Sequence, residues 1–270
     1  MADVVWCHGW RSAWAVLVTA SAAMLLPLTG AAEEAPPPQP RFALPTAPEL
    51  EPWAVEVLQA MSAELAAASS LSFQAVATYE SLARTGLPLA YTTLSEVTLQ
   101  RPDGLRVITP ADGPPSEFYY DGRTMTAYAP EADLAAVAEA PATIDAMLPA
   151  LYGLSATYFP FTDVIVADPY GDLAPDLRLA FYVGQSAVVG GVTTDIVVVA
   201  DDDVQAQWWI GVEDHLPRRI EASFFDELGA FRHVVELSDW RLDPVIAPGT
   251  FASDRAAKAA RIPFAPPGTP

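Results

Sequence analysis

Alternation of apolar and polar residues with a period of two dominates the sequence after residue 70. In residues 89–100, for example, Val97 and Leu99 share one parity, whereas Glu96 and Thr98 take the other. Because successive side chains of a strand point to opposite faces of a sheet, this pattern predicts a strand with one buried face. A chain patterned in this way is expected to fold mainly as an antiparallel sheet.

Similar stretches recur at hairpin-like spacing between clusters of turn-forming residues, which predicts about ten strands. The strongest hairpin signal is Asp121-Gly122, because both central positions of a type I′ turn require positive φ. That turn predicts that Tyr120 faces Arg123 across the hairpin.

Two segments of the chain carry a helical pattern. After Pro52, residues 53–68 place apolar side chains at spacings of three and four, and Pro52 suits the first position of a helix. Residues 131–170 are expected to be rich in helix, with Thr143 as a helix cap and Pro149 as a kink or break. Strands and helices together predict an α+β fold, with helices packed on one face of the sheet.

The ends of the chain differ from its centre. Residues 1–32 predict a cleaved signal peptide, since an apolar stretch follows Arg11 and small residues end at Ala32. A retained membrane anchor is the alternative, although the apolar stretch is shorter than the roughly 20 residues that a spanning helix needs. We expect a Pro-rich linker at 33–52, one domain at 53–251 and a Pro-rich C-terminal tail at 252–270, in a protein located in the periplasm.

Charge and composition exclude several functions. Fourteen basic residues against 34 acidic ones give a net charge of -20, which disfavours nucleic-acid binding because phosphate contacts need Lys or Arg. The single cysteine excludes a disulfide framework. No catalytic motif surrounds His215 or His233, and Asp201-Asp202-Asp203 predicts a solvated hairpin tip rather than a calcium loop. We therefore expect no catalytic residues, no metal, no cofactor and no enzymatic activity.

Several short motifs occur in an order that resembles a known family. They span about residues 53–251 and are Met61-Ser62, Arg101-Pro102-Asp103-x-Leu105-Arg106-Val107, Phe118-Tyr119-Tyr120-Asp121-Gly122, Tyr182-Val183-Gly184, Gly190-Gly191-Val192, Trp209-Ile210, Leu216-Pro217-Arg218-Arg219 and Ser238-Asp239-Trp240. In this order the chain resembles an uncharacterised bacterial family of predicted periplasmic proteins, related in fold to outer-membrane lipoprotein carriers.

The resemblance implies a curved antiparallel sheet that forms an incomplete barrel, with helices on its concave face and an apolar interior. In the carriers that interior holds acyl chains. The function expected from it is binding or transport of a lipid, a lipoprotein acyl chain or another apolar molecule, without membrane embedding after signal cleavage. The candidate lining residues are Tyr91, Val97, Leu99, Phe118, Tyr120, Met125, Ile144, Met147, Leu148, Phe181, Val183, Trp208 and Ile210.

Three alternatives stay open at the level of sequence. The first is a structural or interaction protein of the cell envelope, with a fully packed core and an acidic surface that meets a protein partner. An enzyme built from Asp, Glu, His215 or His233 is the second, and a membrane-embedded barrel is the third.

Overall fold

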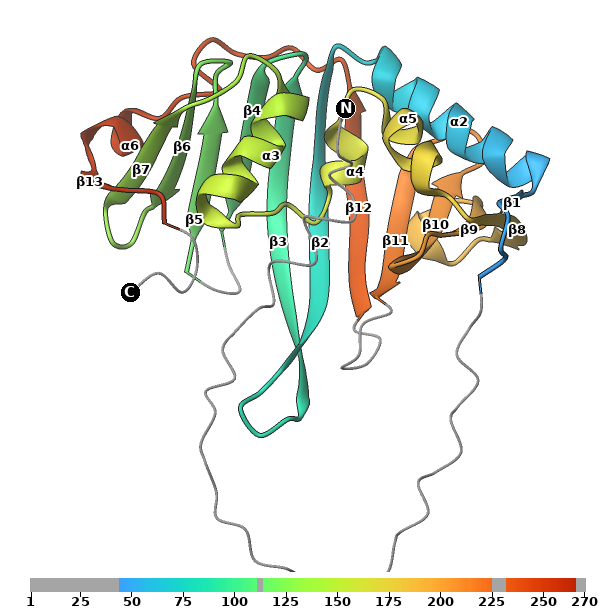
Figure 1. Ribbon diagram of the computed structural model, residues 1–270. Helices are drawn as coiled ribbons and strands as arrows, with labels where there is room; N and C mark the ends of the chain where they lie inside the picture. The colour runs from blue at the N-terminus through green and yellow to red at the C-terminus, as the bar shows by residue number, and fades with distance from the viewer. Residues whose placement is uncertain (1–43, 111–113, 225–231, 266–270) are drawn as a thin grey trace, which may run out of the picture.

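A single curved sheet organises the molecule (Figure 1). The computed structural model describes residues 44–110, 114–224 and 232–265. Thirteen strands lie in the order β1-β8-β9-β10-β11-β12-β2-β3-β4-β5-β6-β7-β13. Their bounds are β1 Glu49–Leu50, β2 Ser70–Leu82, β3 Pro88–Gln100, β4 Gly104–Thr109, β5 Ser116–Tyr120, β6 Thr124–Ala129, β7 Leu134–Glu139, β8 Leu179–Ser186, β9 Thr194–Ala200, β10 Val204–Gly211, β11 Pro217–Phe224, β12 Arg232–Leu242 and β13 Ala260–Ile262.

The sheet consists of two meanders of sequence-adjacent hairpins, one from β2 to β7 and the other from β8 to β12. They meet where β12 pairs with β2 in antiparallel register, with Val235 opposite Ala77. The two border strands, β1 beside β8 and β13 beside β7, are short and parallel to their neighbours. The border strands β1 and β13 do not pair with each other, so the sheet is open.

The predicted count of about ten strands is wrong, because the sheet has 13. The pattern missed the two short border strands and β7, which falls in the segment expected to be helical. The sequence of β7 is LAAVAE, and alanine and glutamate have low β propensity. Pairing with β6 and burial of Ala135 and Ala136 nevertheless hold it in the sheet.

The hairpin at Asp121-Gly122 forms with a different register from the one predicted. Tyr120 faces Met125 rather than Arg123, and only Gly122 of the two central residues has positive φ, at 81°. The Asp121 carboxylate accepts hydrogen bonds from the backbone N–H groups of Arg123 and Thr124, at 3.0 and 2.8 Å. These bonds stabilise a longer loop than a type I′ turn.

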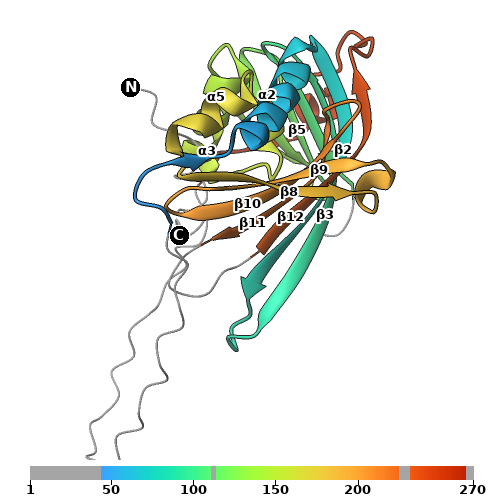
Figure 2. The ribbon, with the colours of Figure 1, turned by 90° about the vertical axis from the view of Figure 1, so that its right-hand side faces the viewer.

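The helices within residues 52–173 cover one face of the sheet, as Figures 1 and 2 show. The last helix packs on the other face, where its Ala256 joins Tyr128 and Ala135 in a separate apolar cluster. The longer ones are α2 (Pro52–Ala67) and α3 (Ile144–Ser155), and the short ones are α4 (Thr162–Ile165), α5 (Pro169–Leu173) and α6 (Asp254–Lys258). Helix α2 begins at Pro52 and buries Leu58, Met61 and Leu65, which confirms the predicted apolar face.

Helix α3 starts as predicted but does not end at Pro149. The Thr143 hydroxyl accepts a hydrogen bond from the Ala146 N–H at 3.2 Å. The helix then continues through Pro149 to Ser155, so the expected break is absent. Burial of Ile144, Met147 and Leu151 against the sheet offsets the hydrogen bond that proline cannot donate.

The segments expected as linker and tail contribute to the folded domain. Glu49–Leu50 forms β1, and the Glu51 carboxylate accepts a hydrogen bond from the Tyr182 N–H at 2.8 Å. After residue 251, α6 buries Ala256 and β13 pairs with β7. The predicted signal peptide and residues 266–270 lie outside the described residues.

A packed core fills most of the space between helices and sheet. Its largest fully buried side chains include Trp208, Tyr120 and Phe161. Within residues 44–110, 114–224 and 232–265, no helix combines the length and the apolar character needed to cross a membrane.

Candidate ligand-binding site

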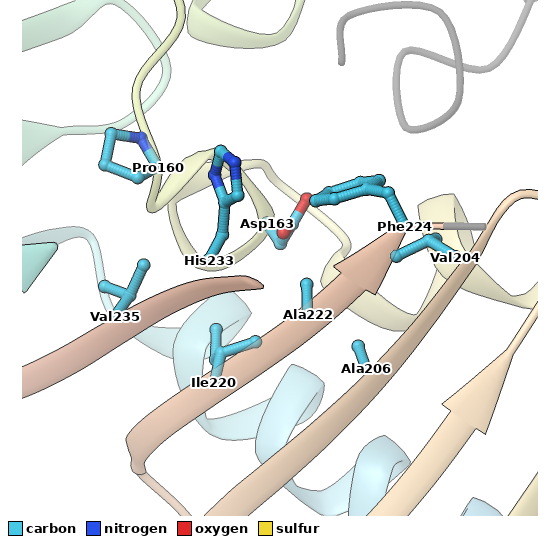
Figure 3. Close-up of a pocket in the computed structure, with 9 residues that line it drawn as sticks. All are labelled: Pro160, Asp163, Val204, Ala206, Ile220, Ala222, Phe224, His233 and Val235. Carbon is cyan, nitrogen blue, oxygen red and sulfur yellow. The ribbon is translucent and has the colours of Figure 1, made fainter. Parts of the chain in front are cut away.

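A pocket opens on the helix-covered face, between the sheet and the segment around α4 (Figure 3). Three neighbouring strands, β10, β11 and β12, form its floor, and Pro160 and Asp163 face them from the helical layer. The strand residues that line it are Val204, Ala206, Ile220, Ala222, Phe224, His233 and Val235.

Two alanines create the space in this pocket. Ala206 on β10 lies directly opposite Ala222 on β11, and Ala222 lies opposite His233 on β12. On one side of the alanine pair, Val204 on β10 lies opposite Phe224 on β11. On the other side, Ile220 on β11 lies opposite Val235 on β12. Larger side chains therefore surround a cross-strand alanine pair. Because the alanine side chains are short, the space above them is left unfilled.

The pocket is small and partly open to solvent. The centres of water molecules can occupy about 20 Å³ of it, and its whole empty space, including the part open to solvent, is about 380 Å³. A single water molecule needs about 10–15 Å³ on the first measure, so the space holds one group of about methyl size.

Arg101 fixes α4 above the sheet. Its guanidinium donates to the carbonyl of Ile165 in α4 at 3.0 Å and to that of Leu65 in α2 at 3.4 Å. Burial lowers the pKa of Arg101, and the nearby Asp145 acts in the opposite direction. The side chain thus joins the ends of two helices and positions the segment that carries Asp163.

His233 and Asp163 are the two titratable side chains that line the pocket, and Figure 3 shows them directed into it from opposite layers. Burial lowers the pKa of His233 from 6.5 to about 4, because desolvation disfavours the charged imidazolium. His233 is therefore neutral at neutral pH.

Two cations of the neighbouring strands, Arg219 and Arg232, lie on the other face of the sheet. Because successive side chains of a strand point to opposite faces of the sheet, Arg219 points away from the face that carries Ile220. Arg232 likewise points away from the face that carries His233. Arg219 forms ion pairs with Glu221 and Glu236 at 2.9 and 3.1 Å, and Arg232 lies 3.9 Å from Glu221. Of the described residues that line the pocket, none is lysine or arginine.

A row of aromatic rings leads from the pocket towards the long β2–β3 hairpin, which projects beyond the neighbouring strands (Figure 1). Phe224 and His233 are 5.2 Å apart between ring centroids, and His233 and Tyr79 are 6.0 Å apart. Tyr79 stacks on Tyr91 at 5.6 Å. Tyr91 is 46% exposed, so the row ends at a surface open to solvent.

The structure places the sequence-predicted lining residues away from this pocket. Ten belong to the packed core, namely Val97, Leu99, Phe118, Tyr120, Met125, Ile144, Met147, Leu148, Trp208 and Ile210. Tyr91, Phe181 and Val183 are exposed instead, at 46%, 38% and 52%. None of the thirteen is among the residues that line the pocket.

Sequence reasoning missed the residues that line the pocket, and several of them, including Ala206, Ala222 and His233, are small or polar. His233 shares the parity of the buried Val235 and Leu237 in β12, and that position within an apolar strand face was the available signal. The paired alanines gave no signal, because their pairing depends on the register between two strands.

The other polar candidates have local roles. The Asp201 carboxylate accepts hydrogen bonds from the N–H groups of Asp203 and Val204, at 2.8 and 2.7 Å, and so shapes the β9–β10 turn. His215 occupies a turn with a φ of 53°. The described parts of the chain contain no group of three or more potential metal ligands.

Comparison with known proteins gave distant structural similarities. A search of curated proteins found no match. LprF from Mycobacterium bovis superposes with a TM-score of 0.45 at 16% identity, over 75% of this chain and 99% of LprF. The lipoprotein LppX of Mycobacterium tuberculosis gives 0.45 at 12% identity, over 73% of this chain and 98% of LppX.

The MucA/MucB complex of Pseudomonas aeruginosa gives a TM-score of 0.41 at 14% identity, over 77% of this chain. This chain spans less than two thirds of the matched chain, at 64%.

The family comparison covers most of the sequence. Residues 54–265 match the model described as "Predicted periplasmic protein (DUF2092)". This range contains the fold from the third residue of α2 to β13, including every residue that lines the pocket. The chain therefore belongs to the DUF2092 family of predicted periplasmic proteins, which confirms the family and the periplasmic location that the sequence indicates.

Proposed function

We propose that this protein binds an apolar ligand, such as the acyl chain of a lipid or lipoprotein, in the pocket between α4 and strands β10–β12, and that it performs no chemistry on it. The observation that carries the proposal is the Ala206–Ala222 pair, which leaves apolar space between two layers that are otherwise packed. Concave apolar sites with a few polar groups are typical of small-molecule binding.

The dimensions of the site indicate how such a ligand lies. The space for one methyl-sized group accepts the end of a chain rather than its whole length. The remainder lies along the row formed by Phe224, His233, Tyr79 and Tyr91. Each methylene removed from water contributes about 0.8 kcal/mol, so several groups along this row are needed for micromolar affinity.

Filling the floor tests the proposal. We expect the parent protein to bind a fatty alcohol that carries a fluorophore at its polar end, and Ala222→Leu to weaken its binding at least tenfold, because leucine occupies the space above the alanine pair that the end of the alkyl chain enters. Ala90→Leu, the same change at an exposed position of β3, is the matched control and should leave binding unchanged. Far-ultraviolet circular dichroism checks that both variants fold.

Two outcomes count against the proposal. One is a parent protein that binds neither this fluorescent fatty alcohol nor the apolar fluorophore N-phenyl-1-naphthylamine. The other is a folded Ala222→Leu variant that binds as tightly as the parent.

A second candidate function is binding of a protein partner, without an apolar ligand. The exposed leucines of the β2–β3 hairpin favour it, since Leu82, Leu87 and Leu89 are 43%, 65% and 43% exposed. Contiguous exposed apolar side chains commonly mark interaction sites. This candidate predicts a parent protein that binds no apolar probe and whose partner is released by Leu87→Ser but not by Ala222→Leu.

A further inference from the structure

We infer that the tip of the β2–β3 hairpin docks the protein on the surface of a lipid bilayer that contains anionic lipids. Residues 82–89 form this tip, and Figures 1 and 2 show the hairpin projecting beyond the strands beside it. In the described residues, β12 pairs with β2 as far as Tyr79 and β4 pairs with β3 as far as Glu96, so the tip lies beyond both neighbours. The tip contributes no residue to the pocket, and the inference therefore goes beyond the proposed function.

Apolar side chains surround the hairpin tip. Leu82 lies opposite Pro88, and Leu89 lies opposite Ser81 at the next position of the ladder. Because successive side chains of a strand point to opposite faces, Leu82 and Leu89 project from opposite faces of the hairpin. Leu87 lies between them in the turn, and all three leucines are exposed. A protein that packed against one face would leave the leucine of the other face in water, whereas the acyl layer of a bilayer can surround the whole tip.

The charge of the hairpin favours an anionic surface. Residues 81–95 contain no Asp or Glu and a single cation, Arg84, which is exposed, although the whole chain has a net charge of -20. A cation close to an anionic bilayer is attracted to it. Salt screens the repulsion between the bilayer and carboxylates that lie farther away than a Debye length of about 8 Å. An anionic surface therefore attracts the tip, although it repels the acidic protein as a whole.

The position of the first carboxylate limits how far the tip enters the bilayer. Along β2 that carboxylate is Glu80, which lies opposite Ala90. Ala90 follows Leu87 by three residues, a distance of about 10 Å at roughly 3.3 Å per residue. Interfacial segments bury their apolar side chains about 5–10 Å deep, so the leucines can enter the bilayer while Glu80 stays in water. Tyr91, which is exposed beside Ala90, then lies at the membrane–water interface, where tyrosine is enriched.

Hydrogen bonds within the turn satisfy part of its backbone. The Ala83 N–H donates to the Leu87 carbonyl at 2.8 Å, and the Gly86 N–H donates to the Ala83 carbonyl at 2.8 Å. A backbone group without a partner costs free energy when it leaves water, so these bonds lower the cost of inserting the tip.

The test measures, by sedimentation, how the protein partitions onto large unilamellar vesicles of phosphatidylcholine and phosphatidylglycerol in equal amounts. Each protein is isolated from the periplasm, so that all variants carry the same N-terminus. We expect the parent protein to sediment with the vesicles. Leu87→Ser should lower the partition coefficient at least tenfold, because serine does not gain free energy by leaving water. Arg84→Gln should lower it at least threefold on these vesicles and leave it unchanged on vesicles of phosphatidylcholine alone.

Leu154→Ser is the matched control, because it makes the same change at a leucine that is 40% exposed in α3. It should leave partitioning unchanged, and far-ultraviolet circular dichroism checks that each variant folds. A parent protein that stays in solution overturns the inference, as does a Leu87→Ser variant that partitions like the parent. Release of a protein partner by Leu87→Ser, without vesicle binding by the parent, also overturns it and assigns the tip to that partner.

The same variants separate this inference from the proposed function. Binding of the fluorescent fatty alcohol is measured without vesicles, and Leu87→Ser should leave it unchanged. Alcohol binding without vesicle binding overturns the docking site alone. Vesicle binding that Leu87→Ser abolishes, in a protein that binds no alcohol, supports the docking site and counts against the pocket.

Discussion

His233 is the residue whose burial has the clearest consequence for stability. Its pKa falls from 6.5 to about 4 in the folded protein, so the unfolded chain binds the proton more tightly. The stabilising contribution of the neutral imidazole is therefore complete above pH 6.5 and is lost as the pH falls towards 4.

We predict that His233→Phe, which keeps an aromatic ring but cannot be protonated, gains stability relative to the parent between pH 6.5 and 4. The gain should reach up to about 3 kcal/mol, since each pH unit between the two pKa values corresponds to about 1.4 kcal/mol. Urea unfolding of both proteins across this pH range measures the difference in their free energies of unfolding. The carboxylates that both proteins share titrate alike, so their contributions cancel in this difference. Parallel pH profiles would show that His233 is not desolvated.

Two of the sequence-predicted ligand residues provide a second prediction. Leu99 is fully buried, whereas Val183 is 52% exposed. Leu99→Ala should lower the free energy of unfolding by about 2–5 kcal/mol, because it leaves a cavity in a packed core. Val183→Ala should change it by roughly 0.5 kcal/mol or less, as is usual at the surface. Equal losses in chemical denaturation would contradict the described burial.

The residues that could be predicted from sequence are those whose environment follows from local pattern. Alternation in β3 predicted that Val97 and Leu99 are buried, and they are. The same alternation gave Tyr91 the parity of the core, yet Tyr91 is exposed near the end of the long β2–β3 hairpin. The pocket itself depends on Ala206 lying opposite Ala222, and no local pattern in either strand specifies that register.

At the scale of the element, the start of α3 depends on one side chain. Thr143 accepts a hydrogen bond from the Ala146 N–H, one of the donors at a helix N-terminus that lack a partner within the helix. Thr143→Ala should lower the free energy of unfolding by about 1 kcal/mol. Thr143→Ser keeps the hydroxyl and should therefore retain most of the stability that the cap contributes. Urea midpoints measure both, and equal midpoints for the two variants would exclude the cap.

Elements with strong local signals were predictable, whereas tertiary contacts decided the others. Pro52 and the apolar face of α2 specify that helix from the sequence alone. Pro149 predicted a break in α3, yet burial of Met147 and Leu151 on either side keeps the helix continuous. The alanine-rich β7 is extended because β6 and β13 flank it.

On the scale of the whole molecule, both borders of the sheet are covered by short segments. β13 pairs with β7 through three residues, and the Ala260 N–H donates to the Asp133 carbonyl at 3.0 Å. All three residues of β13 are exposed, so this strand contributes little apolar burial. Its effect is to occupy backbone groups of β7 that would otherwise be open to other chains.

We therefore predict that a chain ending at Ala259 folds but self-associates, whereas a chain ending at Ala265 does not. The shorter chain lacks β13 and leaves the outer edge of β7 unpaired. Size-exclusion chromatography with light scattering over a range of protein concentrations measures the difference. Identical masses for the two chains at every concentration would show that β13 does not protect the edge.

The junction of the two meanders determines the order in which the sheet can be completed. Every other antiparallel pair joins strands that follow each other in sequence, whereas β12 must reach β2 from the far end of the chain. Closing such a long loop costs entropy before any contact compensates it, so this pairing is expected to form late. Among the edges that are paired in the finished sheet, that of β2 therefore stays open longest during synthesis from the N-terminus, although β2 becomes the middle strand of the sheet.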